Sequence, residues 1–230
     1  LRCDVATYCI GQAASMGAPR LVNHAIQQAG PCGQQKLCAV VGAEAHYSMD
    51  RAVNILGIGI DQLIKVPLDA QGAMLPLELE RAINRVIANG GLPFFVAATA
   101  GTTVRGSYDS IEALLPLRAT YGFWLHVDGA WGGSAVLSSH LRQRYLQGLE
   151  EADSFTWDFH KMLGSTLMCN ILLINKRKRA LATALSAGDG SYLFRDENLA
   201  EAEDLGPMSL QCGRRVDSLK WFLDWKFFGR

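Results

Sequence analysis

The sequence predicts an α/β domain with a mostly parallel β-sheet and helices on both faces of that sheet. Two observations favour this fold class. Apolar runs of strand character alternate with stretches of helical periodicity, which is the order of βαβ units. The chain has 230 residues, of which 49% are hydrophobic, so it can bury a sizeable core as one large domain over residues 1–230.

The first part of the chain predicts a strand, a helix and a second strand. An apolar run indicates a strand over Leu37–Gly42. Ser48 is a suitable N-cap for the helix that follows, in which Val53 and Leu56 share one face. The next strand is predicted over Gln62–Val66. This order is that of one βαβ unit.

The middle of the chain predicts an amphipathic helix followed by a buried strand. Pro76 suits the first turn of the helix, because proline has the required φ and lacks the N–H that would be left unpaired there. Apolar residues then recur at helical spacing, at Leu79, Ile83, Val86 and Ile87. Gly90 and Gly91 end the helix, and Phe94–Ala98 is the predicted strand.

The remaining elements continue the alternation. A helix from about Ser110 precedes a strand over Phe123–Asp128. Two further strands are predicted over Ser154–Trp157 and Asn170–Ile174, and a strongly apolar helix over Val216–Phe228. Such alternation gives a mostly parallel sheet that helices cover on both faces.

Two segments combine strand ends with residue types that suggest a chemistry. The strand that ends at Asp128 and the segment that ends at Lys161 each stop at a polar residue, where α/β sheets present side chains to ligands. An aspartate that holds a pyridinium nitrogen and a lysine that forms a Schiff base are the two protein groups that pyridoxal 5'-phosphate requires. We therefore predict that Asp128 and Lys161 bind this cofactor.

Asp128 also has simpler interpretations. Alternate residues of a strand share a face, so Trp124, His126 and Asp128 point the same way. A buried acid there needs a partner, and from the strand alone a helix cap or an arginine would serve as well as a pyridinium. His126 and Asp128 are two potential metal ligands, but no third histidine or cysteine lies near them in the sequence, so no metal is expected.

Lys161, His46 and the two threonines after Gly101 are the other candidates. Most lysines are solvated surface charges, but apolar residues flank Lys161, and their desolvation of its amine would favour the neutral form that attacks an aldehyde. His46 follows a strand, where it is either a ligand contact, a cap or a core histidine. The hydroxyls of Thr102 and Thr103 either bond a ligand or close a turn.

Beyond these residues, the chain resembles the glutamate and cysteine sulfinate branch of the group II pyridoxal phosphate decarboxylases. The segments that carry the resemblance are Ala45–Ser48, Leu56–Gly59, Pro93–Val104, Trp124–Asp128, Ala152–Ser154, His160–Met162, Ser191–Phe194 and Gln211–Arg214. The resemblance implies the large domain of the aspartate aminotransferase-like fold, known as fold type I, with pyridoxal 5'-phosphate as cofactor. It also implies decarboxylation of an acidic L-amino acid: glutamate, aspartate or cysteine sulfinate.

The resemblance further implies a role for individual residues. Lys161 would be the covalent anchor of the cofactor, and His160 would contact the phosphate or the region of the Schiff base. His46 would stack on the pyridine ring. Thr103 would contact the cofactor, and Ala130 would be the small residue packed under the ring.

Two departures from the family pattern concern the phosphate. Asp158-Phe159 stands where the family usually has Asn-Pro, which puts a carboxylate near the expected phosphate position. Two like charges 4 Å apart repel by about 4 kcal/mol at an effective dielectric constant near 20, so Asp158 must turn away, pair with a cation or weaken binding. In place of the family's phosphate loop the chain has only a loose segment from Gly11 to Gly17.

Complete members of the family resembled are roughly twice as long as this chain. We therefore expect an incomplete large domain without the N-terminal segment and the C-terminal small domain, and a homodimer when full length. Two other functions stay open. The same residues could serve transamination or another fold type I reaction, and a truncated chain could be a cofactor-free interaction module.

The composition excludes several classes of partner. Lys plus Arg and Asp plus Glu both number 22, so neither nucleic acid nor a membrane surface is expected to bind. The six cysteines form no CxxC pair, which fits free thiols in a reducing, cytoplasmic compartment. The dinucleotide fingerprint, the GxxxxGK(S/T) P-loop and the GxSxG nucleophile elbow of hydrolases are missing as well.

Overall fold

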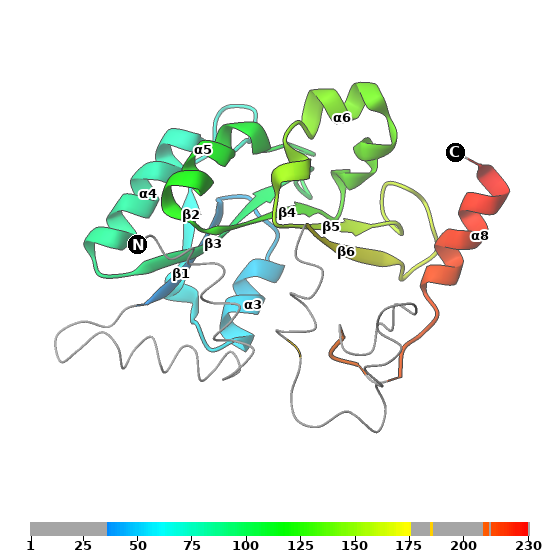
Figure 1. Ribbon diagram of the computed structural model, residues 1–230, viewed down its shortest axis with the longest axis horizontal. Helices are drawn as coiled ribbons and strands as arrows, with labels where there is room; N and C mark the ends of the chain where they lie inside the picture. Colours follow the sequence, from blue (N-terminus) through cyan, green and yellow to red (C-terminus); the bar gives the residue numbers. More distant parts are fainter. Residues whose placement is uncertain (1–35, 176–184, 186–208, 212, 230) are drawn as a thin grey trace.

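The structure is a computed structural model that describes residues 36–175, 185, 209–211 and 213–229. One six-stranded sheet runs through it in the order β2-β1-β3-β4-β5-β6 (Figure 1). Its strands are β1 (Leu37–Gly42), β2 (Leu63–Val66), β3 (Leu92–Thr99), β4 (Trp124–Gly129), β5 (Ser154–Asp158) and β6 (Asn170–Ile174). Each predicted strand is confirmed, with ends that differ by no more than two residues.

The sheet is mostly parallel, as predicted. β1 pairs in parallel with β2 and β3, and β4 pairs in parallel with β3 and β5. Only β6 is antiparallel, at the edge beside β5. Because β2 lies on one side of β1 and β3 on the other, the sheet has a topological switch point between β1 and β3.

Helices lie on both faces of the sheet. In Figure 1, α4, α5 and α6 lie on one side of the sheet and α3 on the other. The helices are α3 (Ser48–Ile55), α4 (Pro76–Ala88), α5 (Ile111–Tyr121), α6 (Ser139–Tyr145) and α8 (Ser218–Phe228). Short 3-10 helices span Ile60–Gln62, Gly132–Leu137 and Leu149–Glu151. The predicted helices are present, although α8 begins two residues later than expected.

The two ends of α3 differ from the prediction. Ser48 is the first residue of the helix, and Tyr47 occupies the N-cap position without a side-chain hydrogen bond. The Ser48 N–H donates to His46 Nδ1 at 3.3 Å, so a histidine takes the acceptor role predicted for serine. At the other end Leu56 is the C-cap and is 44% exposed, which leaves Val53 as the buried member of the predicted pair.

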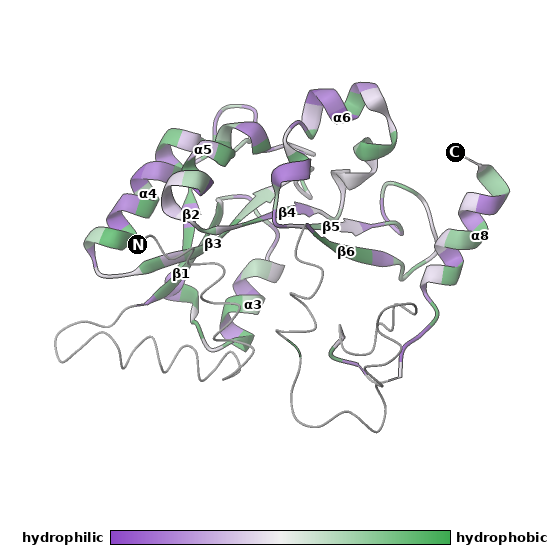
Figure 2. Ribbon diagram, in the orientation of Figure 1, coloured by the Kyte–Doolittle hydropathy of each residue, from purple (hydrophilic) through white to green (hydrophobic). Residues whose placement is uncertain are grey.

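The two faces of the sheet bury different clusters. The larger cluster packs the strands against α4 and α5 and includes Val40, Val96, Leu125 and Val127. The smaller cluster lies around α3 and consists of Ala39, Val41, Val53, Leu63 and Ala97. Figure 2 shows both hydrophobic and hydrophilic residues along α4, as expected for a helix that buries one face. Ile87, one residue beyond the buried stripe of α4, is exposed.

Two sequence predictions lie outside the described residues, namely the Gly11 to Gly17 segment and the segment Ser191–Phe194 that carries part of the family resemblance.

Two of the six cysteines, Cys38 and Cys169, lie within the described residues, and both are free and buried. In the described part of the chain, no helix has the length and apolar character needed to cross a bilayer.

Candidate functional site

The predicted site residues follow the carboxyl ends of four parallel strands. Because these strands run in one direction, the residues lie along one edge of the sheet, which includes the switch point between β1 and β3. His46 follows β1, Thr103 follows β3, Asp128 and Ala130 lie at the end of β4, and His160 and Lys161 follow β5. The fold thus brings these residues to one edge. Among the described residues, no hydrogen bond or ion pair joins a candidate from one strand to a candidate from another.

Asp128 is a buried carboxylate at this edge, with 9% of its surface exposed. Its Oδ1 accepts the N–H of Ala130 at 3.1 Å, and its backbone carbonyl accepts the N–H of Ala100 at 2.8 Å. Neither an arginine nor another cation pairs with Asp128 among the residues that the structure describes. A buried carboxylate without a cation is costly, so the second oxygen is a suitable acceptor for a positively charged N–H of a ligand.

His126 lies on the same face of β4 as Asp128, stacked on Phe95 with ring centroids 5.8 Å apart. Trp124 Nε1 donates to Ser154 Oγ at 2.7 Å, because an indole nitrogen can only donate. The Ser154 hydroxyl can then donate its own proton to His126 Nδ1 at 2.8 Å. If Nδ1 accepts in this way, the proton of the neutral imidazole is on Nε2, which lies 3.4 Å from Thr156 Oγ1.

The electrostatics of this pair leave the charge of Asp128 uncompensated. Burial lowers the pKa of His126 from its ordinary value of 6.5, against the attraction of the Asp128 carboxylate, which raises it. The imidazole is therefore neutral at pH 7. Both of its nitrogens have hydroxyl partners, and the described residues contain no group of three or more potential metal ligands. His126 thus places no positive charge beside Asp128.

Lys161 lies in the turn that leaves β5, and its side chain is 36% exposed. Its Nζ lies 2.9 Å from Oδ2 of Asp158, a residue that is only 8% exposed. The partly desolvated amine expected from the flanking apolar residues stays a prediction, and the structure adds a carboxylate partner for that amine. Of the three possibilities for Asp158, the structure shows pairing with a cation.

Helix α8 and a histidine brace the segment that carries Lys161. Trp221 of α8 stacks on Phe159 with ring centroids 4.5 Å apart. Lys220 Nζ, also from α8, donates to the carbonyl oxygens at 167 and 168 at 3.2 and 2.9 Å. Inside the segment His160 Nδ1 lies 2.8 Å from the carbonyl oxygen of Cys169. One ring nitrogen of His160 is thus engaged with the backbone, and the other, Nε2, lies 3.9 Å from Asp158 Oδ2.

His46 is half-buried at the start of α3. Its ring centroid lies 4.2 Å from that of Tyr47, with a tilt of 45° between the rings. Through Nδ1 it accepts the first N–H of the helix, so of the interpretations open from the sequence it acts as a cap in this structure. This bond orients the ring in the loop that follows β1.

Thr102 and Thr103 have different surroundings in the turn after β3. Thr102 is buried, and its Oγ1 accepts the N–H of Ser107 at 3.0 Å. Thr103 is exposed, and no partner of its hydroxyl lies among the described residues. The turn interpretation therefore holds for Thr102, whereas the Thr103 hydroxyl is available to a ligand.

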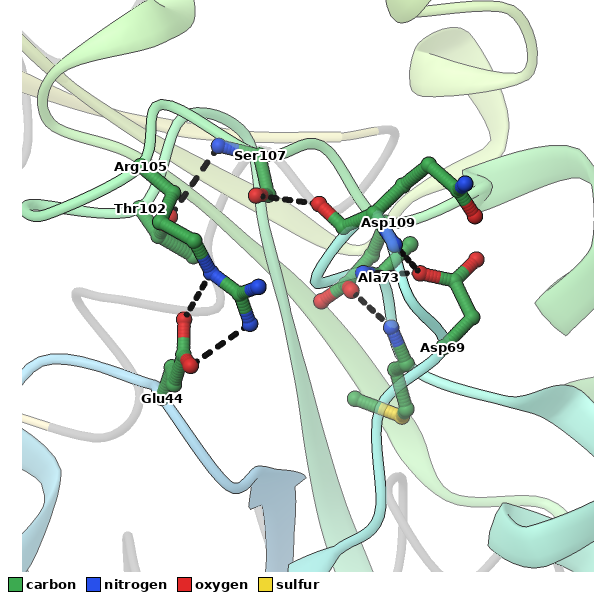
Figure 3. Close-up of polar contacts among 9 residues, drawn as sticks. Glu44, Asp69, Ala73, Thr102, Arg105, Ser107 and Asp109 are labelled. Carbon is green, nitrogen blue, oxygen red and sulfur yellow. Dashed lines mark hydrogen bonds and ion pairs between the residues drawn. The ribbon is translucent and has the colours of Figure 1, made fainter.

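Polar contacts tie together the loops that follow β1, β2 and β3 (Figure 3). Arg105 Nε and Nη2 donate to the two carboxylate oxygens of Glu44 at 2.9 and 2.6 Å. Ser107 Oγ donates to the carbonyl oxygen of Gln71 at 2.7 Å. The turn that carries Thr103 is thereby anchored to the loops that follow β1 and β2.

Asp109 fixes the same region from inside. Its Oδ1 accepts the N–H of Met74 at 2.5 Å, and its Oδ2 accepts the N–H of Thr99 at 2.7 Å. Burial raises the pKa of Asp109, while these two backbone hydrogen bonds oppose the rise. The carboxylate thus joins the loop after β2 to the end of β3.

Sequence reasoning missed several of these contributors. Ser154 and Thr156 share the face of His126 on the neighbouring strand, so alternation along the predicted strands could have identified them. Glu44 and Arg105 are 61 residues apart, and no local pattern connects them. Such pairs follow from the way the strands are ordered in the sheet.

Known proteins match most of the chain. The pyridoxal-dependent decarboxylase conserved domain matches residues 13–230. The acidic amino acid decarboxylase GADL1 of Bos taurus is 40% identical over 205 residues, which make up 89% of this chain and 39% of that protein. The cysteine sulfinic acid decarboxylase of Homo sapiens is 42% identical over 194 residues, or 84% of this chain and 39% of that protein. The chain thus spans about two fifths of the length of these relatives.

Solved structures show the same fold. The crystal structure of mouse CSAD matches with a TM-score of 0.80 and 35% identity, and the match covers 98% of this chain and 45% of that one. The crystal structure of Oryza sativa TDC with PLP and tryptamine matches with a TM-score of 0.79 and 25% identity, over 96% of this chain and 46% of that one. The fold expected from the sequence is therefore confirmed.

Proposed function

Because the chain belongs to the pyridoxal-dependent decarboxylase family, we propose that it forms the cofactor-binding part of an enzyme that decarboxylates an acidic L-amino acid. The proposed substrates are glutamate, aspartate and cysteine sulfinate, and the products are the amine and carbon dioxide. The names of the relatives support this class of substrate, since one is an acidic amino acid decarboxylase and another a cysteine sulfinic acid decarboxylase.

One observation carries the proposal. The buried carboxylate of Asp128 has no cation partner among the described residues, and it ends β4 next to the strand that leads to Lys161. These are the two groups that pyridoxal 5'-phosphate needs, one at its ring nitrogen and one at its aldehyde. The donor set at the edge of the sheet therefore fits this cofactor.

The chain's residues would divide the work as follows. Bound pyridoxal 5'-phosphate supplies an electron sink for the electrons of the bond between the substrate's Cα and its carboxylate. The Asp128 carboxylate would stabilise the positive charge at the ring nitrogen. Because His126 is neutral, it leaves the negative charge of that carboxylate uncompensated. Thr103 would bond the cofactor through its exposed hydroxyl. His46 would cover the ring and exclude water from one side of it, and Ala130 would leave space on the other.

Lys161 would hold the cofactor through its amine. Once a substrate amine has displaced it, the same amine would be placed to return a proton to Cα after carbon dioxide has left. His160, next to it and fixed to the backbone by Nδ1, would present Nε2 to the phosphate or to the amine. In this proposal each of these residues has a binding or proton-transfer task.

The first test is chemical trapping of the lysine. We expect the chain to turn yellow with pyridoxal 5'-phosphate, to lose the colour on borohydride reduction, and to carry the reduced label on Lys161, because an imine is reducible and an amide is not. Peptide mass spectrometry locates the label. A label mainly on another lysine, such as Lys65, would remove Lys161 from the site.

The second test separates decarboxylation from transamination. With each acidic amino acid, a protein carried to full family length should release carbon dioxide and form no 2-oxo acid. Asp128→Asn should keep the fold and some cofactor but lose most of the turnover, because the amide has a similar volume and no charge to stabilise a protonated ring. Unchanged turnover in Asp128→Asn would make Asp128 a structural residue.

We also propose that the full-length protein is a cytoplasmic homodimer. Apolar side chains are exposed along α8, among them Leu219, Phe222 and Leu223, and exposed apolar surface of this kind supports an interface. The free thiols of Cys38 and Cys169 are compatible with a reducing compartment. Light scattering of the full-length protein tests the dimer, and imaging of a tagged protein in cells tests the compartment.

A further inference from the structure

The Asp158–Lys161 contact gives Asp158 a place in the proposed chemistry that the family resemblance does not. Lys161 Nζ and Asp158 Oδ2 are 2.9 Å apart, and the aspartate is nearly buried while the lysine is exposed. The carboxylate is therefore a fixed point on the protein, and the amine is the mobile partner. His160 Nε2, at 3.9 Å from the same oxygen, is the other basic side chain that the described residues bring to Asp158.

The backbone holds this pair in place. Asp158 is the last residue of β5, where it is in register with Asn170 of β6. The Lys161 N–H donates to the Asp158 carbonyl at 3.2 Å, which closes the turn between them. The Ser165 N–H donates to the Phe159 carbonyl at 3.0 Å just beyond it. Breaking the ion pair thus requires only that the lysine side chain swing away from a fixed backbone.

An amine held in this way is a poor nucleophile. Lys161 in the ion pair is an ammonium, which has no lone pair to form a bond with a carbonyl carbon. To react, it must leave Asp158 and give one proton to solvent. Nζ then bonds to the carbonyl carbon, and the carbonyl oxygen leaves as water.

We infer that Asp158 is a positioning residue that restrains Lys161 while no carbonyl group is bound to it, and that it receives the ammonium again when a substrate amine displaces the lysine. This inference rests on the proposed function for its purpose, but the restraint itself is a property of the chain. Its consequence is that Lys161 reacts with carbonyl and acyl reagents more slowly than an unrestrained lysine of equal exposure.

The test measures the reactivity of single lysines without any cofactor. The whole 230-residue chain is treated briefly with an acylating reagent at fixed pH, and mass spectrometry gives the rates at Lys161 and Lys65. Asp158→Asn should raise the rate at Lys161 about two- to fivefold, the ratio expected for loss of a partly exposed ion pair, and leave the rate at Lys65 unchanged. Asp158→Glu, which keeps a carboxylate, should stay close to the unsubstituted chain.

Lys65 provides a matched control, because its Nζ lies 2.9 Å from Asp50 with a similar exposure of 44%. Asp50→Asn should raise the rate at Lys65 and leave Lys161 unchanged. Unfolding would raise both rates together, so the ratio of the two reports the restraint alone. If Asp158→Asn unfolds the chain, Asp158→Ser carries the same expectation. Equal ratios in the folded Asn or Ser variant and the unsubstituted chain would overturn the inference.

A second measurement keeps this result separate from the proposed function. Pyridoxal 5'-phosphate is added to both proteins, followed by borohydride after different times. The label on Lys161 should form faster in Asp158→Asn, and identical rates would count against the restraint. Absence of label from Lys161 in both proteins would count against the proposed function, with the acylation ratio still deciding the role of Asp158.

Discussion

The sheet face under α4 and α5 and the carboxyl edge of the same strands are stabilised in different ways. On the face, Leu125 and Val127 of β4 are fully buried among the aliphatic residues of the larger cluster. At the edge, Asp128 and Asp109 are buried carboxylates, and hydrogen bonds and ion pairs hold the loops. The face therefore gains most from the hydrophobic effect, and the edge from the orientation of polar groups.

One strand can contribute to both regions because of the way its side chains alternate. Alternate residues of β4 point to opposite faces, so Leu125 supports the core while His126 meets Phe95 and two hydroxyls on the other side. A substitution on the face should mainly change the free energy of unfolding. A substitution at the edge should mainly change the local geometry of the site.

The largest effect is expected from Leu125→Ala. Leu125 is fully buried, so the substitution should lower the free energy of unfolding by about 2–5 kcal/mol through lost burial and the cavity left behind. Urea unfolding followed by tryptophan fluorescence measures it. Leu137→Ala is the control, because Leu137 is 48% exposed, and a similar loss in both variants would break the distinction between face and edge.

A smaller loss is expected at the edge from Asp109→Asn. The amide keeps one acceptor oxygen but turns its NH2 toward the second backbone N–H, so one buried donor loses its partner, at a cost of about 1–3 kcal/mol in unfolding free energy. In Asp69→Asn the loss should be slight, since Oδ1 of Asp69 accepts from both Gln71 and Ala73 and an amide oxygen can replace it. Equal losses of unfolding free energy in the two variants would contradict the importance of having each Asp109 oxygen accept a different backbone N–H.

The pH dependence of stability tests the polar side of β4. Burial lowers the pKa of His126 below 6.5. As the pH falls, the imidazole is therefore protonated at a higher pH in the unfolded chain than in the folded chain. The contribution of neutral His126 is complete above pH 6.5 and is lost as the pH falls below it, by at most about 1.4 kcal/mol per pH unit. Unfolding free energies at pH 7.5 and 5.5 measure the loss, and His126→Gln should reduce it. The same pH dependence in His126→Gln would contradict the assignment.

The smallest effect is expected from Arg105→Ala. The Glu44 and Arg105 side chains are 40% and 41% exposed, so removing their ion pair should cost about 0–1 kcal/mol of unfolding free energy, and less at high salt. Arg81→Ala, which removes another exposed ion pair, is the control. If Arg105→Ala alone cost more than about 2 kcal/mol, the edge would depend on this pair far more than its exposure suggests.

The local patterns of the sequence were sufficient for most of the fold. Period-two alternation separated Leu125 and Val127 from His126 and Asp128, and helical spacing identified the buried side of α4. The sequence patterns did not indicate some polar contacts between residues two or three positions apart. Ser48 did not become the N-cap, and its N–H donates to His46 instead. The ion pair of Lys161 with Asp158 was one of three possibilities left open for that carboxylate.

Residues close together along the chain were enough to predict the alternation of elements and the polar residues at the ends of β4 and β5, an acid and a lysine among them. The order of the strands comes from tertiary packing, which sets β1 and β3 side by side with their loops joined by Glu44 and Arg105. It also decided that hydroxyls of β5 surround His126. Contacts of this kind join residues far apart in the chain, and they form only when packing brings whole strands together.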